Sequence, residues 1–211
     1  MKTSDVLKAL LGAASLALPL TVSAESNVQS GAGTLNATAH VDFEIVIPQI
    51  LYLRVGAGSS YTTGVLTSNP AVDLITFSPT AAQVGSGTAI TGTGGDITGS
   101  TETAAIVSNF GSVTLTSTST GALSDGAAGD SIAFTQITTT ATANTYGTTL
   151  QAPVLSNGAG STVTINAPAS KVIQADAKWA FSYANTTTPP AGTYGGAGVN
   201  NGRVVYTASM P

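Results

Sequence analysis

Residues 35–55 read LNATAHVDFEIVIPQILYLRV, and the first thirteen alternate between apolar and polar side chains. Side chains on a β-strand point alternately to its two faces, so this pattern predicts one long strand with a dry face and a wet face. Pro48 and Gln49 interrupt the pattern, which resumes at Ile50 and ends before Gly56. A proline within a strand indicates an edge, a bulge or a crossing between sheets. The dry face carries Leu35, Ala37, Ala39, Val41, Phe43, Ile45 and Ile47, and only Val46 breaks the polar register of the other face.

The first 24 residues have the pattern of a secretory signal peptide. Lys2 and Lys8 precede an apolar run over residues 9–20. Val22-Ser23-Ala24 then provides a small-x-small cleavage site. An N-terminal core helix is the alternative. No other stretch is long and apolar enough to span a bilayer, which needs about 20 residues. We therefore expect cleavage after Ala24 and a secreted protein, extracellular or at the cell surface via the periplasm, with no membrane span after signal removal.

The composition excludes several classes of partner. Removal of residues 1–24 leaves four basic and nine acidic residues, a net charge of −5, and charged residues make up only 8% of the full chain. So weakly charged a chain has no basic surface for nucleic acid or anionic lipid. It contains no cysteine, so no disulfide constrains the unfolded state. A surface of hydroxyl and small side chains favours self-association.

The remaining sequence predicts an all-β protein. Residues 25–34 are rich in Ser and Gly and are expected to form a flexible N-terminal arm. Residues 35–211 are expected to form one antiparallel β-sandwich, because short apolar runs are separated by Gly, Pro and Asn turns at intervals of about 8–12 residues. Residues 81–103 are predicted to form turns and weak edge strands. Further strands are expected over residues 72–77, 104–107, 113–115, 132–137, 150–155, 163–165, 179–183 and 204–206, with a hairpin turn at Asn157-Gly158.

Candidate catalytic and metal sites are weak. His40 is the only histidine, beside Asp42 on the wet face, and a solvated histidine explains it better than a base or metal ligand without partners. Asp125 and Asp130 flank a turn that lacks the ligand pattern of a calcium loop. Gly129-Asp130-Ser131 is similar to an esterase block, but no histidine follows residue 40. We predict no catalytic, cofactor-binding or metal residues, no cofactor, and no enzymatic activity.

Aromatic residues support one alternative function. Trp179, Phe181 and Tyr183 alternate along one predicted strand, and Tyr206 lies on the last. Trp179, Tyr183 and Tyr206 could form a platform on which sugars stack, as in an extracellular carbohydrate-binding or adhesin module. Core packing is the stronger interpretation, because the aromatic rings share one face. We therefore expect the Trp179 indole and the Phe181 ring to be buried.

The long N-terminal strand suggests self-association through edge strands. A regular strand behind a flexible arm can add to the sheet of another subunit, with main-chain hydrogen bonds for affinity and alternate side chains for specificity. Asp42 and Glu44 lie on the wet face, where they would not block this pairing. The alternative is that residues 35–47 form the first strand of their own sandwich.

The two ends of the chain resemble the fimbrial and spore-coat-U-like β-sandwich proteins of Gram-negative bacteria. The likeness is carried by residues 202–209, GRVVYTAS, and by residues 41–55. Gly198 stands fourteenth from the end, where pilins often have glycine, whereas Met210 replaces their penultimate tyrosine and their disulfide is absent. The resemblance implies an immunoglobulin-like (pilin-like) fold, a periplasmic chaperone that recognises the last strand, and subunits joined by a donated N-terminal strand. The expected function is a secreted, non-enzymatic structural protein, a surface or filament subunit.

Overall fold

The computed structural model describes residues 26–56, 64–126 and 129–211, so the predicted signal peptide, residues 1–24, lies outside the described residues. The chain divides after Ile47 into an N-terminal unit and a compact unit, residues 48–211. The secondary structure of the described residues is almost entirely β, with one short 3-10 helix, η1. The strands of the compact unit are β1 (Leu51–Val55), β2 (Ile75–Thr76), β3 (Ile90–Thr91), β4 (Thr93–Gly94), β5 (Thr101–Ser108), β6 (Val113–Ser119), β7 (Leu123–Ser124), β8 (Ser131–Ile132), β9 (Ile137–Ala143), β10 (Ala159–Ile165), β11 (Ile173–Tyr183) and β12 (Val204–Ser209), and η1 spans Phe134–Gln136.

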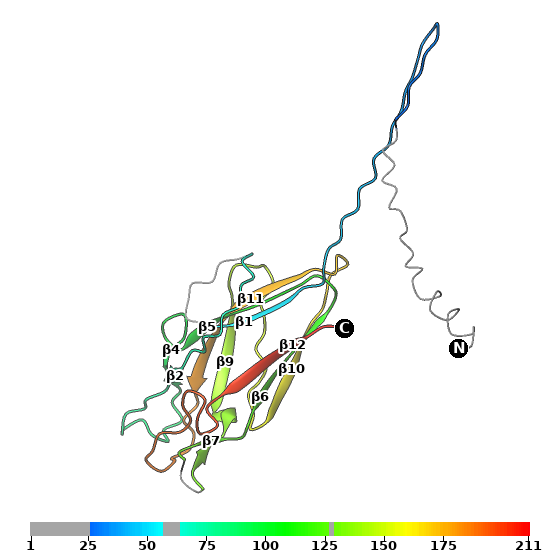
Figure 1. Ribbon diagram of the computed structural model, residues 1–211. Coiled ribbons are helices and arrows are strands. Elements are labelled where there is room, and N and C mark those ends of the chain that lie inside the picture. The colour runs from blue at the N-terminus through cyan, green and yellow to red at the C-terminus, as the bar shows by residue number, and fades with distance from the viewer. Residues whose placement is uncertain (1–25, 57–63, 127–128) are drawn as a thin grey trace, which may run out of the picture. The chain divides into compact units, whose positions relative to one another are not determined.

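Two antiparallel sheets dominate the described part of the compact unit (Figure 1). In the larger sheet β1 pairs with β5, β5 pairs with β11, and β11 also pairs with β9 and β3. In the smaller sheet β6 lies between β10 and β12. The pairs β2–β4 and β7–β8 are short additions. This all-β arrangement is consistent with the predicted β-sandwich.

The hydrophobic core lies between these two sheets. Ala104 and Ile106 of β5 and Val113 and Leu115 of β6 are completely buried in one cluster. Trp179 is also completely buried, and its indole N–H donates a 2.7 Å hydrogen bond to the carbonyl oxygen of Leu150. The bond satisfies a polar group that would be costly to bury unpaired. Burial of Trp179 and Phe181 confirms the sequence prediction. The rest of the buried cluster is Phe134, Leu150, Leu155, Ile173, Ala175, Ala177 and Phe181.

Two buried polar side chains organise irregular segments around the sheets. The carboxylate of Asp176, in the middle of β11, accepts hydrogen bonds from the backbone N–H groups of Thr145 and Tyr146. Asn185, which ends β11 with a positive φ of 55°, accepts a bond from the Gly85 N–H and donates one to the Gln83 carbonyl. Loops without regular structure are therefore held by single side chains within the fold.

Most predicted strands are present, with three corrections. Residues 132–137, predicted as one strand, are divided: β8 ends at Ile132, η1 occupies Phe134–Gln136, and β9 begins at Ile137. Residues 35–47, predicted as the first long strand, form no strand, and every residue from 26 to 50 is exposed. Alternation describes the shape that a segment favours, whereas a strand also needs a partner for its backbone groups. Residues 150–155 form no strand either, although Leu150 and Leu155 are buried; the chain does turn at Asn157-Gly158, and β10 then pairs with β6.

Candidate functional site

An open groove on the described part of the compact unit has a cavity volume of about 1220 Å³. Strands β1 and β12 line it, together with three connecting segments. Apolar clefts of this size are the usual form of binding sites in proteins. The connecting residues that line it fall mainly in the ranges 67–79, 189–198 and 202–203.

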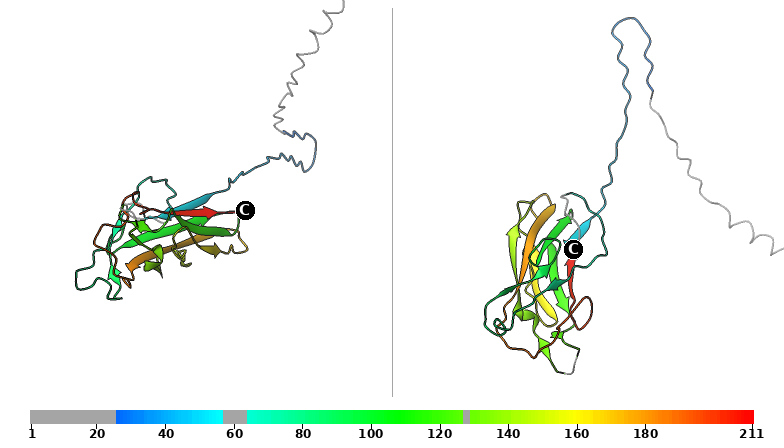
Figure 2. Two further views of the ribbon diagram at one scale, coloured as in Figure 1. Left: turned by 90° about the horizontal axis from the view of Figure 1, so that it is seen from below. Right: turned by 90° about the vertical axis from the view of Figure 1, so that its left-hand side faces the viewer.

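The two strands that border the groove are each paired on one side within the described chain. β1 pairs with β5 and β12 pairs with β6, and the two strands are neighbours without a ladder between them (Figures 1 and 2). Such edges present unpaired N–H and C=O groups to any extended segment that fits between them. The groove therefore offers both an apolar surface and backbone hydrogen-bonding groups.

The end of the groove at which β1 and β12 approach each other is called its closed end here, and the end at Val55 and Val204 its open end. At the closed end the Ser108 hydroxyl donates a 3.4 Å hydrogen bond to the sulfur of Met210, and Ser108 is also the register partner of Leu51. The end of β12 therefore approaches the beginning of β1. At the open end, Val55 and Val204 line the groove.

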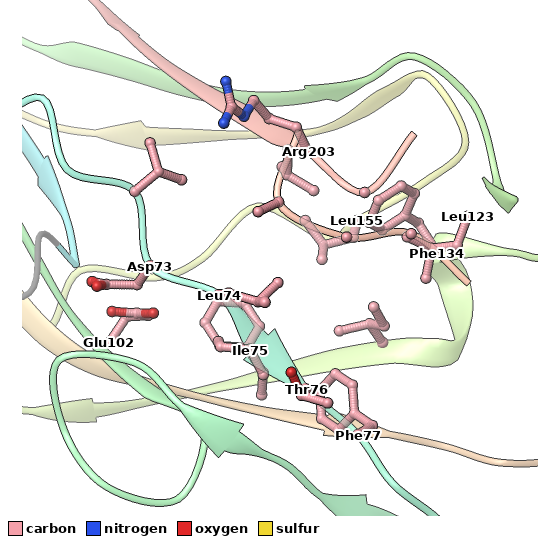
Figure 3. A pocket seen from close by; sticks show the side chains of 18 of the residues that line it. Asp73, Leu74, Ile75, Thr76, Phe77, Glu102, Leu123, Phe134, Leu155 and Arg203 are labelled. Carbon is pink, nitrogen blue, oxygen red and sulfur yellow. The ribbon is translucent and has the colours of Figure 1, made fainter. Parts of the chain in front are cut away.

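Core side chains form the floor of the groove. Phe134, Leu155 and Phe181 are buried, yet all three line the groove, as Figure 3 shows for Phe134 and Leu155. Tyr183 also lines it, and its buried hydroxyl has no hydrogen-bond partner in the structure. A segment that filled the groove would extend the hydrophobic core rather than cover a polar surface.

Residues 67–79, which we call the groove strap, form one wall of the groove. Residues 64–72 are exposed, and from Asp73 onward every second side chain is partly buried, including those of Ile75 and Phe77. The Phe77 ring lies 6.2 Å from the Tyr183 ring, and β2 pairs with β4. The second half of the strap is therefore held by packing and pairing, and its first inward side chain is a carboxylate.

That carboxylate meets a second one at the open end of the groove. Glu102 of β5 is only 5% exposed, and in Figure 3 its carboxyl group and that of Asp73 face one another. The two side chains are close enough to share a hydrogen bond, and both carboxyl groups lie against Gly56. Burial, and then the neighbouring Asp73 and Asp96, raise the pKa of Glu102 to about 8, although the Asp96 N–H donates to it at 3.1 Å. A bond between two carboxyl groups needs a proton on one of them.

A third carboxyl group nearby, that of Asp96, is paired with a cation. The guanidinium of Arg54 forms a 3.1 Å salt bridge with Asp96, whose side chain is almost completely buried. Asp96 also accepts hydrogen bonds from the backbone N–H and the hydroxyl of Thr103. The charge of Asp96 is thus compensated within the turn before β5, whereas Glu102 faces the interior.

The N-terminal unit provides the complementary feature. Its apolar side chains are the most exposed of the described chain: Phe43 is 87% exposed and Ile45 is 85% exposed. An exposed run of large apolar side chains is unusual on a protein surface and marks an interaction site. Residues 35–47 therefore form a segment without regular structure whose apolar side chains are all exposed.

The other sequence candidates lie in different parts of the chain. His40 lies on the exposed N-terminal segment, and the rings of Trp179 and Tyr183 are buried, so neither is available for sugar stacking. The turn between Asp125 and Asp130 includes residues 127–128, which lie outside the described residues. In the described ranges no three His, Cys, Asp or Glu side chains gather as a metal site.

Sequence reasoning missed the Glu102–Asp73 pair, although one signal was present. In the β5 sequence TETAAIVS, Glu102 occupies the same face as Ala104 and Ile106, where an apolar residue would be expected. Its partner in the strap could not be found from the sequence, because 29 positions separate the two residues.

Comparisons with known proteins give no relative: no family model, curated protein or solved structure matches this chain. Within residues 26–56, 64–126 and 129–211, no helix has the length and apolar character needed to cross a membrane.

Proposed function

We propose that this protein is a secreted, non-enzymatic structural protein, a subunit of a surface or filament assembly whose copies join by β-strand pairing. Residues 35–47 of one copy would enter the groove between β1 and β12 of the next. The observation that carries this function is the conjunction of an uncovered, alternating apolar segment with an open apolar groove between two sheet edges.

The segment is longer than the two strand edges with which it would pair. Thirteen extended residues span about 43 Å at roughly 3.3 Å per residue, whereas the bordering strands β1 and β12 have five and six residues. The segment can therefore pair along the whole length of both edges. Its alternation would place the dry face on the groove floor and leave Asp42 and Glu44 in solvent.

Burial of the apolar stripe gives the driving force. Transfer of one large aliphatic or aromatic side chain from water to a core contributes about 1.5–3 kcal/mol. Val41, Phe43, Ile45 and Ile47 are all exposed in the isolated chain. Ordering the segment opposes this gain, at about 1–2 kcal/mol per residue for the backbone. Both the apolar contacts and the new backbone hydrogen bonds are then needed for stable docking.

Residues 48–50, which connect the segment to β1, favour donation of the segment to another copy over its return to the groove of its own chain. The amide of Asn109 accepts a 2.9 Å hydrogen bond from the Ile50 N–H and donates one of 2.9 Å to the Pro48 carbonyl. These bonds fix residues 48–50 before β1 begins. Folding back beside β1 would require a tight turn at these same residues.

The proposal also covers the topology of the fold and the location of the protein. We include in the same proposal an immunoglobulin-like, pilin-like topology, and export through the periplasm directed by residues 1–24. The low charge of the chain, 8% Asp, Glu, Lys and Arg, supports close packing of copies without strong repulsion.

Two neighbouring substitutions test the function in the full mature chain. Ile45→Asp places a charge on the dry face, and Val46→Asp places the same charge on the wet face; both positions are more than 80% exposed. We expect Ile45→Asp to weaken self-association at least 100-fold, because it would bury an unpaired charge, and Val46→Asp to have a minor effect. Analytical ultracentrifugation and electron microscopy measure assembly, and the melting temperature of each monomer controls for folding. Equal effects of the two substitutions, or no assembly of the unaltered chain at high concentration, would contradict strand donation.

A further inference from the structure

The side chain of Glu102 places a carboxyl group on the core face of β5. On that face its neighbours are Trp179, its register partner on β11, and Ala104, and both are completely buried. Burial of an ionised carboxylate in such surroundings is costly unless a counter-charge compensates it. The partner that reaches Glu102 is another carboxyl group, Asp73 of the groove strap.

We infer that the proton shared by Glu102 and Asp73 is a latch that holds the groove strap against the open end of the groove, and that loss of this proton frees the groove for an incoming strand. The latch rests on the proposed function for its consequence, strand entry, but not for its chemistry. With the proton present, one carboxyl group donates to the other; without it, two negative charges meet in a poorly solvated site.

The titratable groups that face Glu102 are mostly acidic. Asp73 approaches from the strap and Asp96 from the turn before β5, and both act to raise the pKa of Glu102. Arg54 of β1 is the nearby cation, and its guanidinium is engaged by Asp96. From β12, Tyr206 faces Glu102, and burial together with the Glu102 charge raises the pKa of its phenol. The Tyr206 phenol therefore stays neutral.

The strap is built so that release at Asp73 would be local. Residues 64–72 are exposed, so Asp73 is the first partly buried residue of the strap. Beyond it, Ile75 and Phe77 pack against the core, and β2 remains paired with β4. Opening would therefore move residues 67–74 about a fixed point near Ile75. Val55 and Glu102 line the groove beside this segment, so the movement would widen its open end.

Hydrogen exchange in the full mature chain tests the latch without reference to assembly. Amide protection of residues 64–74 is measured at pH 7 and pH 9.5 and compared at each pH with Glu102→Gln, which keeps the shape and stays neutral. We expect the unaltered chain to lose protection in this segment at pH 9.5 relative to Glu102→Gln, with residues 75–77 unchanged. Asp73→Asn is the second variant and should behave like Glu102→Gln. Equal protection in all three proteins at pH 9.5 would overturn the latch.

Strand entry is tested with a fluorescent peptide of residues 35–47 added to the same full-length proteins. The ionised fraction of a group titrating near pH 8 rises about tenfold between pH 7 and pH 9.5, so the association rate should rise by about tenfold. Glu102→Gln should show little change, which also corrects for any pH dependence that comes from the peptide itself. Peptide binding at equal rates at both pH values would overturn the coupling and leave the proposed function intact. Strap opening with no peptide binding at either pH would overturn the proposed function and leave the latch supported.

Discussion

The rings of Trp179 and Tyr206 lie 5.4 Å apart between centroids, tilted by 48°, and join β11 of the larger sheet to β12 of the smaller one. Tyr206 also lines the groove and faces Glu102. One pair of aromatic side chains thus connects the centre of the core with the site where we propose that a strand binds. A substitution at either of these two residues is therefore expected to change both protein stability and strand binding. Substitutions away from this pair can change one without the other.

Phe181→Ala should destabilise the protein by about 3–5 kcal/mol, because it removes a buried aromatic ring and leaves a cavity. The ring is 8% exposed, is part of the core cluster and lines the groove. Urea denaturation followed by tryptophan fluorescence measures the loss. Phe110→Ala provides the matched control, since that ring is 41% exposed. An unchanged unfolding midpoint for Phe181→Ala would mean that the core face of β11 has been misassigned.

The free energy of unfolding should fall as the pH rises from about 4.5 to about 8. The pKa of Glu102 is raised from 4.5 to about 8 in the folded protein, so across this range the unfolded chain has lost a proton that the folded chain retains. The limiting slope for one such group is about 1.4 kcal/mol per pH unit. Above pH 8 both states are ionised and the dependence levels off. Denaturation at pH 5, 7 and 9 measures it, and Glu102→Gln should remove most of the slope; an equal slope in that variant would refute the assignment.

A chain that begins at Pro48 should fold with the same core, because residues 48–211 form a compact unit that contains the whole hydrophobic cluster. We expect it to remain monomeric and to be stabilised by the peptide of residues 35–47. Peptide at 100 times its dissociation constant would contribute about 2.7 kcal/mol. Differential scanning calorimetry with and without peptide measures the gain. A peptide carrying Ile45→Asp should give none, and failure of the shortened chain to fold would show that residues 35–47 belong to its own core.

Asn109→Ala should loosen residues 48–50, which connect the N-terminal segment to β1. The side chain makes two hydrogen bonds to the backbone of residues 48–50, each contributing about 0.5–1.5 kcal/mol to stability. We expect a loss of about 1–2 kcal/mol and a larger fraction of monomers that have closed on themselves. Sedimentation velocity at several concentrations measures this fraction. An unchanged distribution of assembled and monomeric protein would show that the hydrogen bonds of Asn109 do not decide whether the segment binds its own chain or another copy.

The sequence determined the fold class and much of the core. Alternating apolar residues predicted β11 and β12 near their observed positions, and the shared face of Trp179 and Phe181 predicted their burial. Alternation is a local property of the chain, and burial follows from it when a sheet face meets a core. Residues 150–155 show the limit, since Leu150 and Leu155 are buried there without any strand pairing.

Residues 35–47 show most clearly what the sequence determines and what only the tertiary structure determines. The sequence determined their two-faced pattern, because alternation needs only thirteen consecutive side chains. Whether that pattern forms a strand depends on which sheet edges are available, and only the tertiary structure decided that these residues are exposed and belong to no strand. The meeting of Asp73 with Glu102 likewise depends on how the strap crosses the sheet. Contacts between residues distant in the sequence follow from strand order and packing, which no local pattern encodes.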